Sequence, residues 1–276
     1  MTIPDLQLND GTTLPAIGLG TYGLRGPEGV ESLASGIAAG YRLLDTALNY
    51  RNEQEVGEAV RGCGLDRSEL LVTTKLPGRH HGYEETLASF EESRSNLGLD
   101  YVDLYLIHWP LPRVGKYLDS WKAMIELRDR GDVRSIGVSN FTPRLLTELI
   151  DETGVAPAVN QVELHPYFPQ TELREFHARH GIVTESWSPL ARRRDVAREP
   201  VVQRIAAAHS VTPIQAVLRW HIQLGALPIP KSANPERQQA NLDVFGFALS
   251  EAEIAEVSTL EDDRLWGADP ETHEEF

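Results

Sequence analysis

The sequence predicts an α/β protein of the (β/α)8 TIM barrel class, and three observations support this prediction. Short apolar runs alternate with helix-like segments along nearly the whole chain of 276 residues. Most connections between these runs are too long for hairpins and suit right-handed crossovers between parallel strands. Eight such runs fit the roughly 250 residues that this barrel typically needs. We therefore expect a barrel with an N-terminal hairpin and a C-terminal loop over the active-site face.

The expected strands are short, apolar and bounded by polar or turn-forming residues. A hairpin comes first, with Asn9-Asp10-Gly11 as the turn between Leu6–Leu8 and a strand that starts at Thr13. The barrel strands are expected at Ala16–Leu19, Arg42–Asp45, Leu70–Lys75, Val102–His108, Arg134–Ser139, Val159–Glu163, Val183–Ser186 and Leu227–Pro230.

Several helices between these strands have recognisable first turns. Thr142, Thr212 and Asn234 are each followed by proline, which suits the first position of a helix. Thr212 and Ser250 are followed three residues later by Gln or Glu, which is the pattern of a capping box. Asn52 is likewise followed by a glutamate and indicates a further helix start.

Composition and charge exclude several classes of protein. No linker or shift in composition divides the chain, so we expect residues 1–276 to form a single barrel domain. The 26 Lys and Arg against 41 Asp and Glu give a net charge of −15, which argues against nucleic-acid partners and anionic membranes. Cys63 is a single cysteine, so no internal disulfide is expected. With no secretory leader and no run of about 18–20 apolar residues, a cytoplasmic monomer is expected.

A glycine-rich segment offers a competing interpretation of the fold. Gly18-Leu19-Gly20-Thr21-Tyr22-Gly23 matches the dinucleotide-binding pattern G-x-G-x-x-G, and Asp45 ends the next strand. In that pattern the third glycine lies in a helix, whereas here Leu24–Gly29, with two glycines and a proline, delays any helix to about Glu28. We favour a loop over the barrel mouth and keep the doubly wound dinucleotide-binding fold as the alternative.

Four side chains suited to proton transfer stand at or just beyond strand ends. Asp45, Lys75 and His108 each end an apolar run, and Tyr50 follows the first of these runs. Because the C-terminal ends of barrel strands meet on one face, the four are expected to form one site. An ammonium lowers the pKa of a neighbouring phenol, a carboxylate keeps that ammonium charged, and an imidazole can polarise a carbonyl. This set of groups indicates carbonyl reduction.

Longer segments around these residues resemble the signature motifs of the aldo-keto reductase superfamily. The resemblance covers roughly Leu6 to Pro270, and a tail segment, Trp266–Pro270, adds to the similarity with the bacterial branch that contains the 2,5-diketo-D-gluconate reductases. It implies a barrel enzyme that reduces aldehydes or ketones to alcohols with a nicotinamide cofactor. The motifs are Gly40-Tyr41-Arg42-Leu43-Leu44-Asp45-Thr46-Ala47-Leu48-Asn49-Tyr50-Arg51-Asn52-Glu53, Leu104-Tyr105-Leu106-Ile107-His108-Trp109-Pro110, Gly137-Val138-Ser139-Asn140-Phe141 and Ile229-Pro230-Lys231-Ser232.

The resemblance implies a role for each of the four residues. Tyr50 would be the general acid, and Lys75 would hold its pKa below the usual value of about 10. Asp45 would keep the buried Lys75 charged. His108, as a neutral imidazole, would donate a hydrogen bond to the substrate carbonyl, and the sequence leaves open which ring nitrogen carries the proton.

The resemblance also implies a cofactor, NADPH, that lies extended across the barrel mouth. Ser139, Asn140 and Gln161 match residues that bind the nicotinamide carboxamide, and Trp187 takes the place of an aromatic residue that stacks on the nicotinamide ring. Two further cofactor-binding residues are expected in the next loop, Ser188 and Leu190.

At the other end of the cofactor, a phosphate clamp is expected. Lys231, Ser232 and Arg237 match residues that bind the 2′-phosphate, and Asn234 would cap a helix whose first N–H groups face the same phosphate. Asn241 matches a residue that holds the adenine. This set favours NADPH over NADH, with plain surface charges as the alternative for the lysine and the arginine.

At three positions the chain departs from the family pattern. Arg51 and Ala191 stand where glycine is usual, and Ala240 stands where a glutamate usually helps to hold the adenine. Arg51 could attract an anionic substrate or point to solvent. By family analogy, the expected walls of an apolar substrate pocket, with packing as the rival role, are Tyr22, Trp109 and Trp266.

Other interpretations fit the sequence less well. Asp45 with Glu163 or Glu185 could form the paired carboxylates of a glycosidase, but the tyrosine and the lysine would then have no role. His80-His81 has no partner at ligand spacing, so no metal site is expected. A cofactor-binding regulatory module with little turnover is the alternative to an enzyme. Arg192-Arg193-Arg194 is expected to be a solvated part of a loop.

Overall fold

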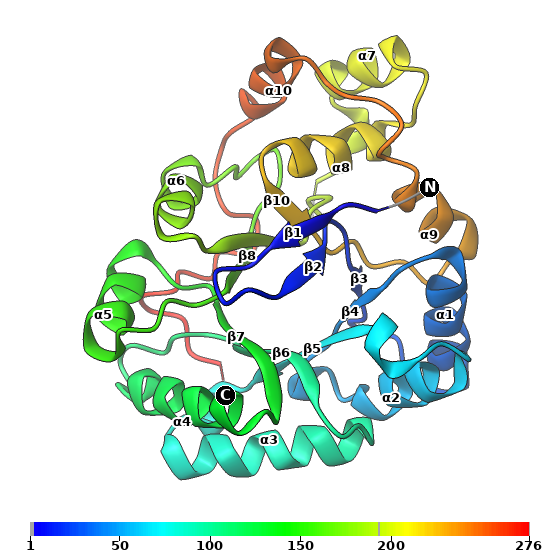
Figure 1. Cartoon of the computed structure of the whole chain (residues 1–276). Coiled ribbons are helices and arrows are strands. Elements are labelled where there is room, and N and C mark those ends of the chain that lie inside the picture. Colours follow the sequence, from blue (N-terminus) through cyan, green and yellow to red (C-terminus); the bar gives the residue numbers. More distant parts are fainter. Residues whose placement is uncertain (1–2, 193, 276) are drawn as a thin grey trace.

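The computed structural model describes residues 3–192 and 194–275 and contains a curled sheet of eight parallel strands (Figure 1). The strands follow one another around this sheet in chain order, and each pairs in parallel with the next. The predicted (β/α)8 class is therefore confirmed. The strands are β3 (Leu19–Gly20), β4 (Leu43–Asp45), β5 (Leu71–Leu76), β6 (Val102–Ile107), β7 (Val133–Ser139), β8 (Val159–Glu163), β9 (Val183–Trp187) and β10 (Ala226–Pro228).

Two glycines of the competing dinucleotide-binding pattern, Gly18 and Gly20, close the barrel. Gly18 N–H donates to the Pro228 carbonyl oxygen at 3.1 Å and Gly20 N–H donates to the Pro230 carbonyl oxygen at 3.2 Å, which joins the first and last strands. A Cβ at Gly20 would lie 2.8 Å from the Ile229 carbonyl oxygen, so this close approach requires glycine. The doubly wound alternative is wrong, because these glycines serve strand pairing.

Helices follow each barrel strand and cover the outside of the barrel (Figure 1). An additional helix, α7, precedes α8 in the connection from β9, and α10 follows α9. In the described ranges, none of the helices combines the length and apolar character needed to cross a membrane. The helices are α1 (Gly26–Ala39), α2 (Glu53–Gly62), α3 (Tyr83–Leu97), α4 (Tyr117–Arg130), α5 (Pro143–Thr153), α6 (Thr171–His180), α7 (Pro200–Ala208), α8 (Pro213–Gln223), α9 (Pro235–Leu242) and α10 (Glu251–Ser258), with 3-10 turns η1 (Leu48–Tyr50), η2 (Arg67–Glu69), η3 (Gly78–His80) and η4 (Val196–Arg198).

The predicted helix starts are confirmed by their caps. Thr142, Thr212, Asn234 and Ser250 each accept a hydrogen bond, through a side-chain oxygen, from the backbone N–H three residues later. At Thr212 and Ser250 the capping box is complete. Asn52 precedes α2 as predicted, but its side chain makes no capping bond.

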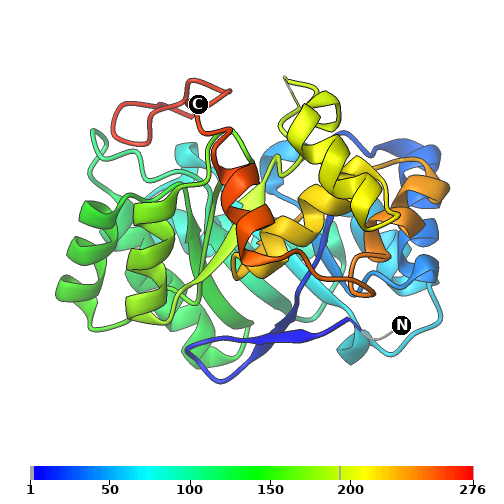
Figure 2. The same ribbon diagram turned by 90° about the horizontal axis from the view of Figure 1, so that it is seen from above.

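The predicted hairpin is confirmed and covers the N-terminal end of the barrel. Its strands are β1 (Asp5–Gln7) and β2 (Thr13–Pro15), which pair antiparallel. Leu8 and Leu14 pack with the apolar residues of the barrel interior, which include Leu43, Leu104, Leu106, Val159, Leu227 and Ile229. Figure 2 shows the hairpin at one end of the barrel and the C-terminal tail at the other. The C-terminal ends of the strands therefore remain available for a site.

Two strands differ from the predicted bounds by more than one residue at an end. The expected strand Ala16–Leu19 contributes only its end to β3, because Ala16 N–H donates to the Pro4 carbonyl oxygen of the hairpin at 2.9 Å. The last strand ends at Pro228 rather than Pro230, and Pro230 has no N–H to donate to a neighbouring strand.

Candidate active site

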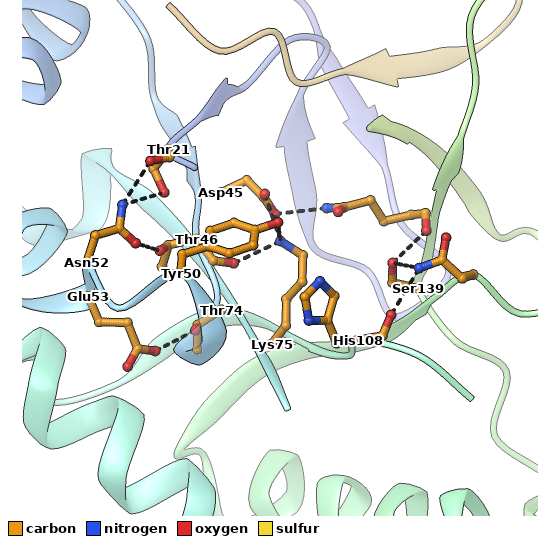
Figure 3. Close-up of polar contacts among 12 residues, drawn as sticks. Thr21, Asp45, Thr46, Tyr50, Asn52, Glu53, Thr74, Lys75, His108 and Ser139 are labelled. Carbon is orange, nitrogen blue, oxygen red and sulfur yellow. Dashed lines mark hydrogen bonds and ion pairs between the residues drawn. The ribbon is translucent and has the colours of Figure 1, made fainter. Parts of the chain in front are cut away.

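Asp45, Tyr50, Lys75 and His108 lie together at the C-terminal ends of neighbouring strands (Figure 3). Asp45 ends β4, Tyr50 ends the η1 turn that follows, Lys75 lies near the end of β5, and His108 directly follows β6. Barrel enzymes carry their sites on this face. The structure therefore brings together the four residues that the sequence singled out.

Lys75 is buried and bound to a carboxylate. Its Nζ donates to Asp45 Oδ1 at 2.7 Å and Oδ2 at 2.8 Å, and to the Thr46 carbonyl oxygen at 2.8 Å. Burial acts to lower the pKa of Lys75, but the attraction of Asp45 outweighs burial and raises this pKa above its usual value. The ammonium therefore stays charged, as predicted.

The Tyr50 hydroxyl lies beside this ammonium. Lys75 Nζ donates to Tyr50 Oη at 3.5 Å and lies 4.9 Å from the centre of the tyrosine ring. Burial raises the pKa of Tyr50, and the positive charge of Lys75 lowers it by less, so the pKa lies above its usual value of 10. The expected net lowering is wrong here, because the loss of hydration exceeds the attraction of Lys75. Tyr50 is therefore protonated at neutral pH.

His108 is held through its backbone, and one of its ring nitrogens lies close to a carboxylate. Its N–H donates to the Leu76 carbonyl oxygen at 3.0 Å, and its carbonyl oxygen accepts from Asn140 Nδ2 at 3.0 Å. Its Nδ1 lies 2.7 Å from Glu275 Oε1, a residue that the sequence did not indicate. The ring centre is 5.9 Å from that of Tyr50, and Figure 3 shows the far end of the imidazole directed toward the tyrosine hydroxyl.

The C-terminal tail crosses the mouth of the barrel, as predicted (Figure 2). The buried carboxylate of Glu163, at the end of β8, accepts from Leu265 N–H at 2.7 Å and from Trp266 N–H at 3.3 Å. Further along, Arg144 on α5 donates to Glu271 at 2.5 Å. Glu163 therefore holds the tail.

The residues expected at the nicotinamide form a connected row of hydrogen bonds. Ser139 Oγ donates to the Gln161 carbonyl oxygen at 2.8 Å and accepts from Asn140 Nδ2 at 3.0 Å. Trp187 Nε1 donates to Asn140 Oδ1 at 2.8 Å. Gln161 Nε2 donates to Asp45 Oδ2 at 2.8 Å. These bonds join the ends of β7, β8 and β9 to the carboxylate that holds Lys75.

The residues expected at the 2′-phosphate lie between β10 and α9. Lys231 and Arg237 are exposed, whereas Ser232 and Asn241 are buried. Ser232 Oγ accepts from Asn234 N–H at 3.1 Å, and Asn234 Oδ1 accepts from Arg237 N–H at 2.8 Å. Two exposed cations therefore stand at the start of a capped helix, where anions are favoured.

The residues expected to line the substrate pocket each contact a ring beside the site. Tyr22 is 56% exposed, while Trp109 and Trp266 are partly buried. The ring pairs, with their centroid separations, are Tyr22 with Tyr50 at 5.1 Å, Trp109 with His273 at 4.2 Å, and Trp187 with Trp266 at 6.1 Å.

Comparison with known proteins decides the family. The model of the aldo/keto reductase family matches residues 16–262, most of the chain. This chain belongs to the aldo/keto reductase family. The match extends from the end of the hairpin to the start of the C-terminal tail, so it contains the four clustered residues.

Members of the aldo/keto reductase family align over nearly the whole chain. A protein named 2,5-diketo-D-gluconic acid reductase B, from Corynebacterium sp. (strain SHS752001), is 60% identical over 274 residues, 99% of each chain. Morphine 6-dehydrogenase of Pseudomonas putida is 46% identical over 279 residues, 97% of this chain and 94% of the relative. A crystal structure of a Gox0644 mutant in complex with NADPH matches with a TM-score of 0.94 and 44% identity, covering 99% of this chain and 100% of that chain.

Two departures from the aldo-keto reductase pattern coincide with left-handed backbone. Arg51 has a φ of 53° and Ala191 a φ of 50°, and Ser188 in the same loop has a φ of 51°. Residues with a Cβ rarely adopt this conformation, whereas glycine adopts it freely. Glycine would therefore fit the backbone at positions 51 and 191 better than Arg51 and Ala191 do. The Arg51 side chain is exposed, which agrees with the expectation that it could point to solvent. Leu190, expected to contact the cofactor, is partly buried.

Asn52 supports the turn that carries Tyr50, a role that its capping pattern did not indicate. Its Nδ2 donates to the carbonyl oxygen of Thr21 at 2.9 Å, and its Oδ1 accepts from Thr46 Oγ1 at 2.8 Å (Figure 3). The same Nδ2 also donates to the Leu24 carbonyl oxygen at 3.0 Å. The loop after β3 is thereby tied to the loop after β4.

The remaining titratable residues do not suggest a second chemistry. Burial raises the pKa of Glu185 to about 8, so this residue, expected as a glycosidase carboxylate in one alternative, is protonated at neutral pH. His80 Nδ1 lies 2.9 Å from Ser89 Oγ, and His81 is buried. Among the described residues, no three His, Cys, Asp or Glu side chains are grouped as a metal site requires. Arg193, in the arginine run, lies outside the described residues.

Proposed function

We propose that this protein reduces aldehydes or ketones to alcohols with NADPH, and that Tyr50 is the general acid. The observation that carries this proposal is the buried Asp45–Lys75 pair, whose ammonium lies 3.5 Å from the Tyr50 hydroxyl. A charged lysine at this distance stabilises the phenolate that remains after the proton has left.

In the proposed reaction, Tyr50 donates its phenolic proton to the carbonyl oxygen as that oxygen gains negative charge. The raised pKa of Tyr50 ensures that the proton is present at neutral pH. Lys75 then stabilises the phenolate, and Asp45 keeps Lys75 charged. His108 binds the carbonyl oxygen beside the tyrosine. The cofactor, when bound, supplies a hydride to the carbonyl carbon.

The residues present fit NADPH. Lys231 and Arg237 offer two exposed cations beside the N-terminus of α9, and this favours the additional phosphate of NADPH over the hydroxyl of NADH. Trp187 is partly buried in the row of Ser139, Asn140 and Gln161, where its indole could stack on a nicotinamide ring. The solved relative in complex with NADPH supports the same assignment.

The substrate is proposed only as a class. The relative named for 2,5-diketo-D-gluconic acid and the one named for morphine differ widely in the molecules their names give, although both align over most of this chain. We therefore propose small aldehydes and ketones, with 2,5-diketo-D-gluconate as one of the compounds to be screened.

Steady-state oxidation of NADPH tests this proposal. We expect turnover with activated carbonyls such as glyoxals or nitrobenzaldehydes, without added metal and unchanged by EDTA. NADPH binding without turnover of any carbonyl would instead support the cofactor-binding regulatory module. Loss of activity on EDTA treatment that zinc restores would contradict the metal-free mechanism.

We further propose that the protein is a single-domain monomer of the cytoplasm. The acidic composition and the absence of a spanning helix among the described residues support a protein that stays in aqueous solution. Size-exclusion chromatography with light scattering tests the oligomeric state, and a mass of two chains would contradict the monomer.

A further inference from the structure

His221, on α8, is fully buried beside the loop that follows β9. Its Nε2 lies 2.9 Å from the Pro189 carbonyl oxygen, and its Nδ1 lies 3.2 Å from Ser186 Oγ. The Trp220 ring packs edge-on against the imidazole, with 4.8 Å between ring centres. One side chain of a helix therefore contacts both ends of the segment Ser186–Pro189.

The acceptor at Pro189 decides which nitrogen of the His221 ring carries the proton. A carbonyl oxygen can only accept a hydrogen bond, so Nε2 must be the donor. Burial lowers the pKa of His221 to about 3, so the ring is neutral near pH 7 and Nδ1 has a lone pair to offer. Ser186 Oγ then donates to Nδ1. Both ring nitrogens thus have a partner of the matching kind, which fixes the orientation of the ring.

The residues expected at the cofactor lie within this segment and just beyond it. Trp187 is expected to stack on the nicotinamide ring, and Ser188 and Leu190 are expected to bind the cofactor in the same loop. Trp187 Nε1 donates to Asn140 Oδ1 at 2.8 Å. The imidazole on α8 therefore holds the main chain of this loop, while Asn140 holds the indole that the loop carries.

The backbone of this loop needs such support. Ser188 has a φ of 51° and Ala191 a φ of 50°, and the turn between them is closed by a bond from Ala191 N–H to the Ser188 carbonyl oxygen at 2.9 Å. Left-handed backbone at residues with a Cβ persists only where the surrounding contacts hold it. The bond from His221 reaches Pro189, between these two residues. Without this bond, we expect the loop to relax toward other conformations.

We infer that His221 is a positioning residue that holds the loop Trp187–Leu190 in the shape that binds the cofactor. It acts through the Pro189 carbonyl and Ser186 Oγ. The loop is expected at the nicotinamide, which NADPH and NADH share, and the phosphate clamp is a separate element between β10 and α9. Loss of the His221 bond should therefore weaken both cofactors by the same factor. This inference deepens the proposed function and rests on its assignment of the cofactor.

Titration of two matched variants with NADPH and NADH tests the inference. His221→Gln keeps a side-chain N–H at the reach of Nε2, whereas His221→Met has a similar length and no N–H. We expect His221→Met to raise both Kd values about tenfold, the usual effect of losing a buried hydrogen bond, and His221→Gln to stay within about threefold of the wild type. The control is His180→Met, at the exposed end of α6, which should bind like the wild type.

Three results of this titration would overturn the inference. Unchanged Kd values in His221→Met would show that the loop does not need the bond. Equal losses in His221→Met and His221→Gln would reduce the role of the ring to packing. A loss confined to NADPH would place the effect at the phosphate clamp. If His221→Met does not fold, His221→Asn takes its place, because its shorter amide can meet Ser186 but not the Pro189 carbonyl.

Hydrogen exchange of the cofactor-free protein measures the loop itself. A peptide that contains Ser188–Ala191 should exchange several-fold faster in His221→Met than in His221→Gln or the wild type, whereas a peptide around Asp45 should not change. Equal exchange of the loop peptide in all three proteins would contradict the inference. This measurement needs no cofactor, so it is independent of the proposed function. A wild type that binds neither cofactor would instead overturn the proposed function.

Discussion

Gln161 Nε2 donates to Asp45 Oδ2 at 2.8 Å. Gln161 was expected from the family resemblance to hold the cofactor, yet in this structure its amide also holds the carboxylate that binds Lys75. Asp45 therefore receives three hydrogen bonds in a buried position, two from Lys75 and one from Gln161. Gln161 thus links the residues expected to bind the nicotinamide to the Asp45 and Lys75 pair beside Tyr50.

The Gln161 contact predicts a loss of stability that appears without any cofactor. Gln161→Leu should lower the free energy of unfolding by about 1–3 kcal/mol, because a hydrogen bond to a buried charge is lost. Urea unfolding of the cofactor-free protein measures this change. The control is Lys231→Ala, an exposed residue of the expected phosphate clamp, which should change the stability by less than about 0.5 kcal/mol. Equal stabilities of Gln161→Leu and wild type would show that the Asp45 contact contributes nothing.

Because Lys231 and Arg237 are exposed cations near α9, we expect the protein to prefer NADPH over NADH. Each charge-assisted bond to the 2′-phosphate contributes about 1.5–3 kcal/mol, so NADPH should bind roughly 10- to 1000-fold more tightly than NADH. Arg237→Ala should weaken NADPH binding far more than NADH binding, and added salt should reduce the difference. Fluorescence titration, with Trp187 as reporter, measures both cofactors. Equal losses for the two cofactors in Arg237→Ala would make Arg237 a plain surface charge.

Because Glu185 has a raised pKa, we expect its contribution to the stability of the protein to depend on pH. Burial raises its pKa from the usual 4.5 to about 8, and the negative charge of Asp45 adds to this effect. Between these values the unfolded chain releases a proton that the folded protein retains, so the contribution of Glu185 to wild-type stability should fall as pH rises from about 4.5 to 8. Glu185→Gln has no such proton to lose, and its stability relative to wild type should grow over this window and level off above it. Urea midpoints measured at several pH values test this, and a constant difference would refute it.

The left-handed backbone at Arg51 leads us to expect that replacing this residue by glycine stabilises the protein. Its φ of 53° is costly for a residue with a Cβ and acceptable for glycine. Arg51→Gly should raise the free energy of unfolding by about 0.5–1 kcal/mol, whereas Arg51→Ala keeps the Cβ and should gain almost nothing. Thermal or urea unfolding of both variants separates the backbone effect from loss of the guanidinium. A gain of the same size in Arg51→Ala would contradict the backbone explanation.

The barrel could be predicted because its signals are local. Apolar runs, proline at first turns and caps such as Thr212 and Ser250 all lie within a few residues of the elements they define. The bounds of the first and last strands could not be predicted, because they depend on pairing between Gly18 and Gly20 and residues about 210 positions later in the chain. The same glycines produced the misleading dinucleotide-binding pattern.

The cluster of Asp45, Tyr50, Lys75 and His108 could be predicted because each residue lies at or just beyond the end of an apolar run, and Asp45, Tyr50 and His108 also lie in family motifs. Glu275 could not, since its partners Asn49 and Gly78 are 226 and 197 positions away and no local pattern marks the tail. The predicted direction of the Tyr50 pKa shift was also wrong, because a sequence indicates the neighbouring charge but not how strongly burial disfavours the phenolate.

Replacing the Tyr50 hydroxyl tests the central claim most directly. Tyr50→Phe removes the proposed proton donor and leaves the Lys75 and Asp45 pair in place. We expect kcat to fall by at least about 100-fold, the usual contribution of a general acid, with NADPH affinity nearly unchanged. Tyr83→Phe, on the outer helix α3, is the matched control and should retain full activity. Turnover of Tyr50→Phe close to that of the wild type would remove Tyr50 from its proposed role.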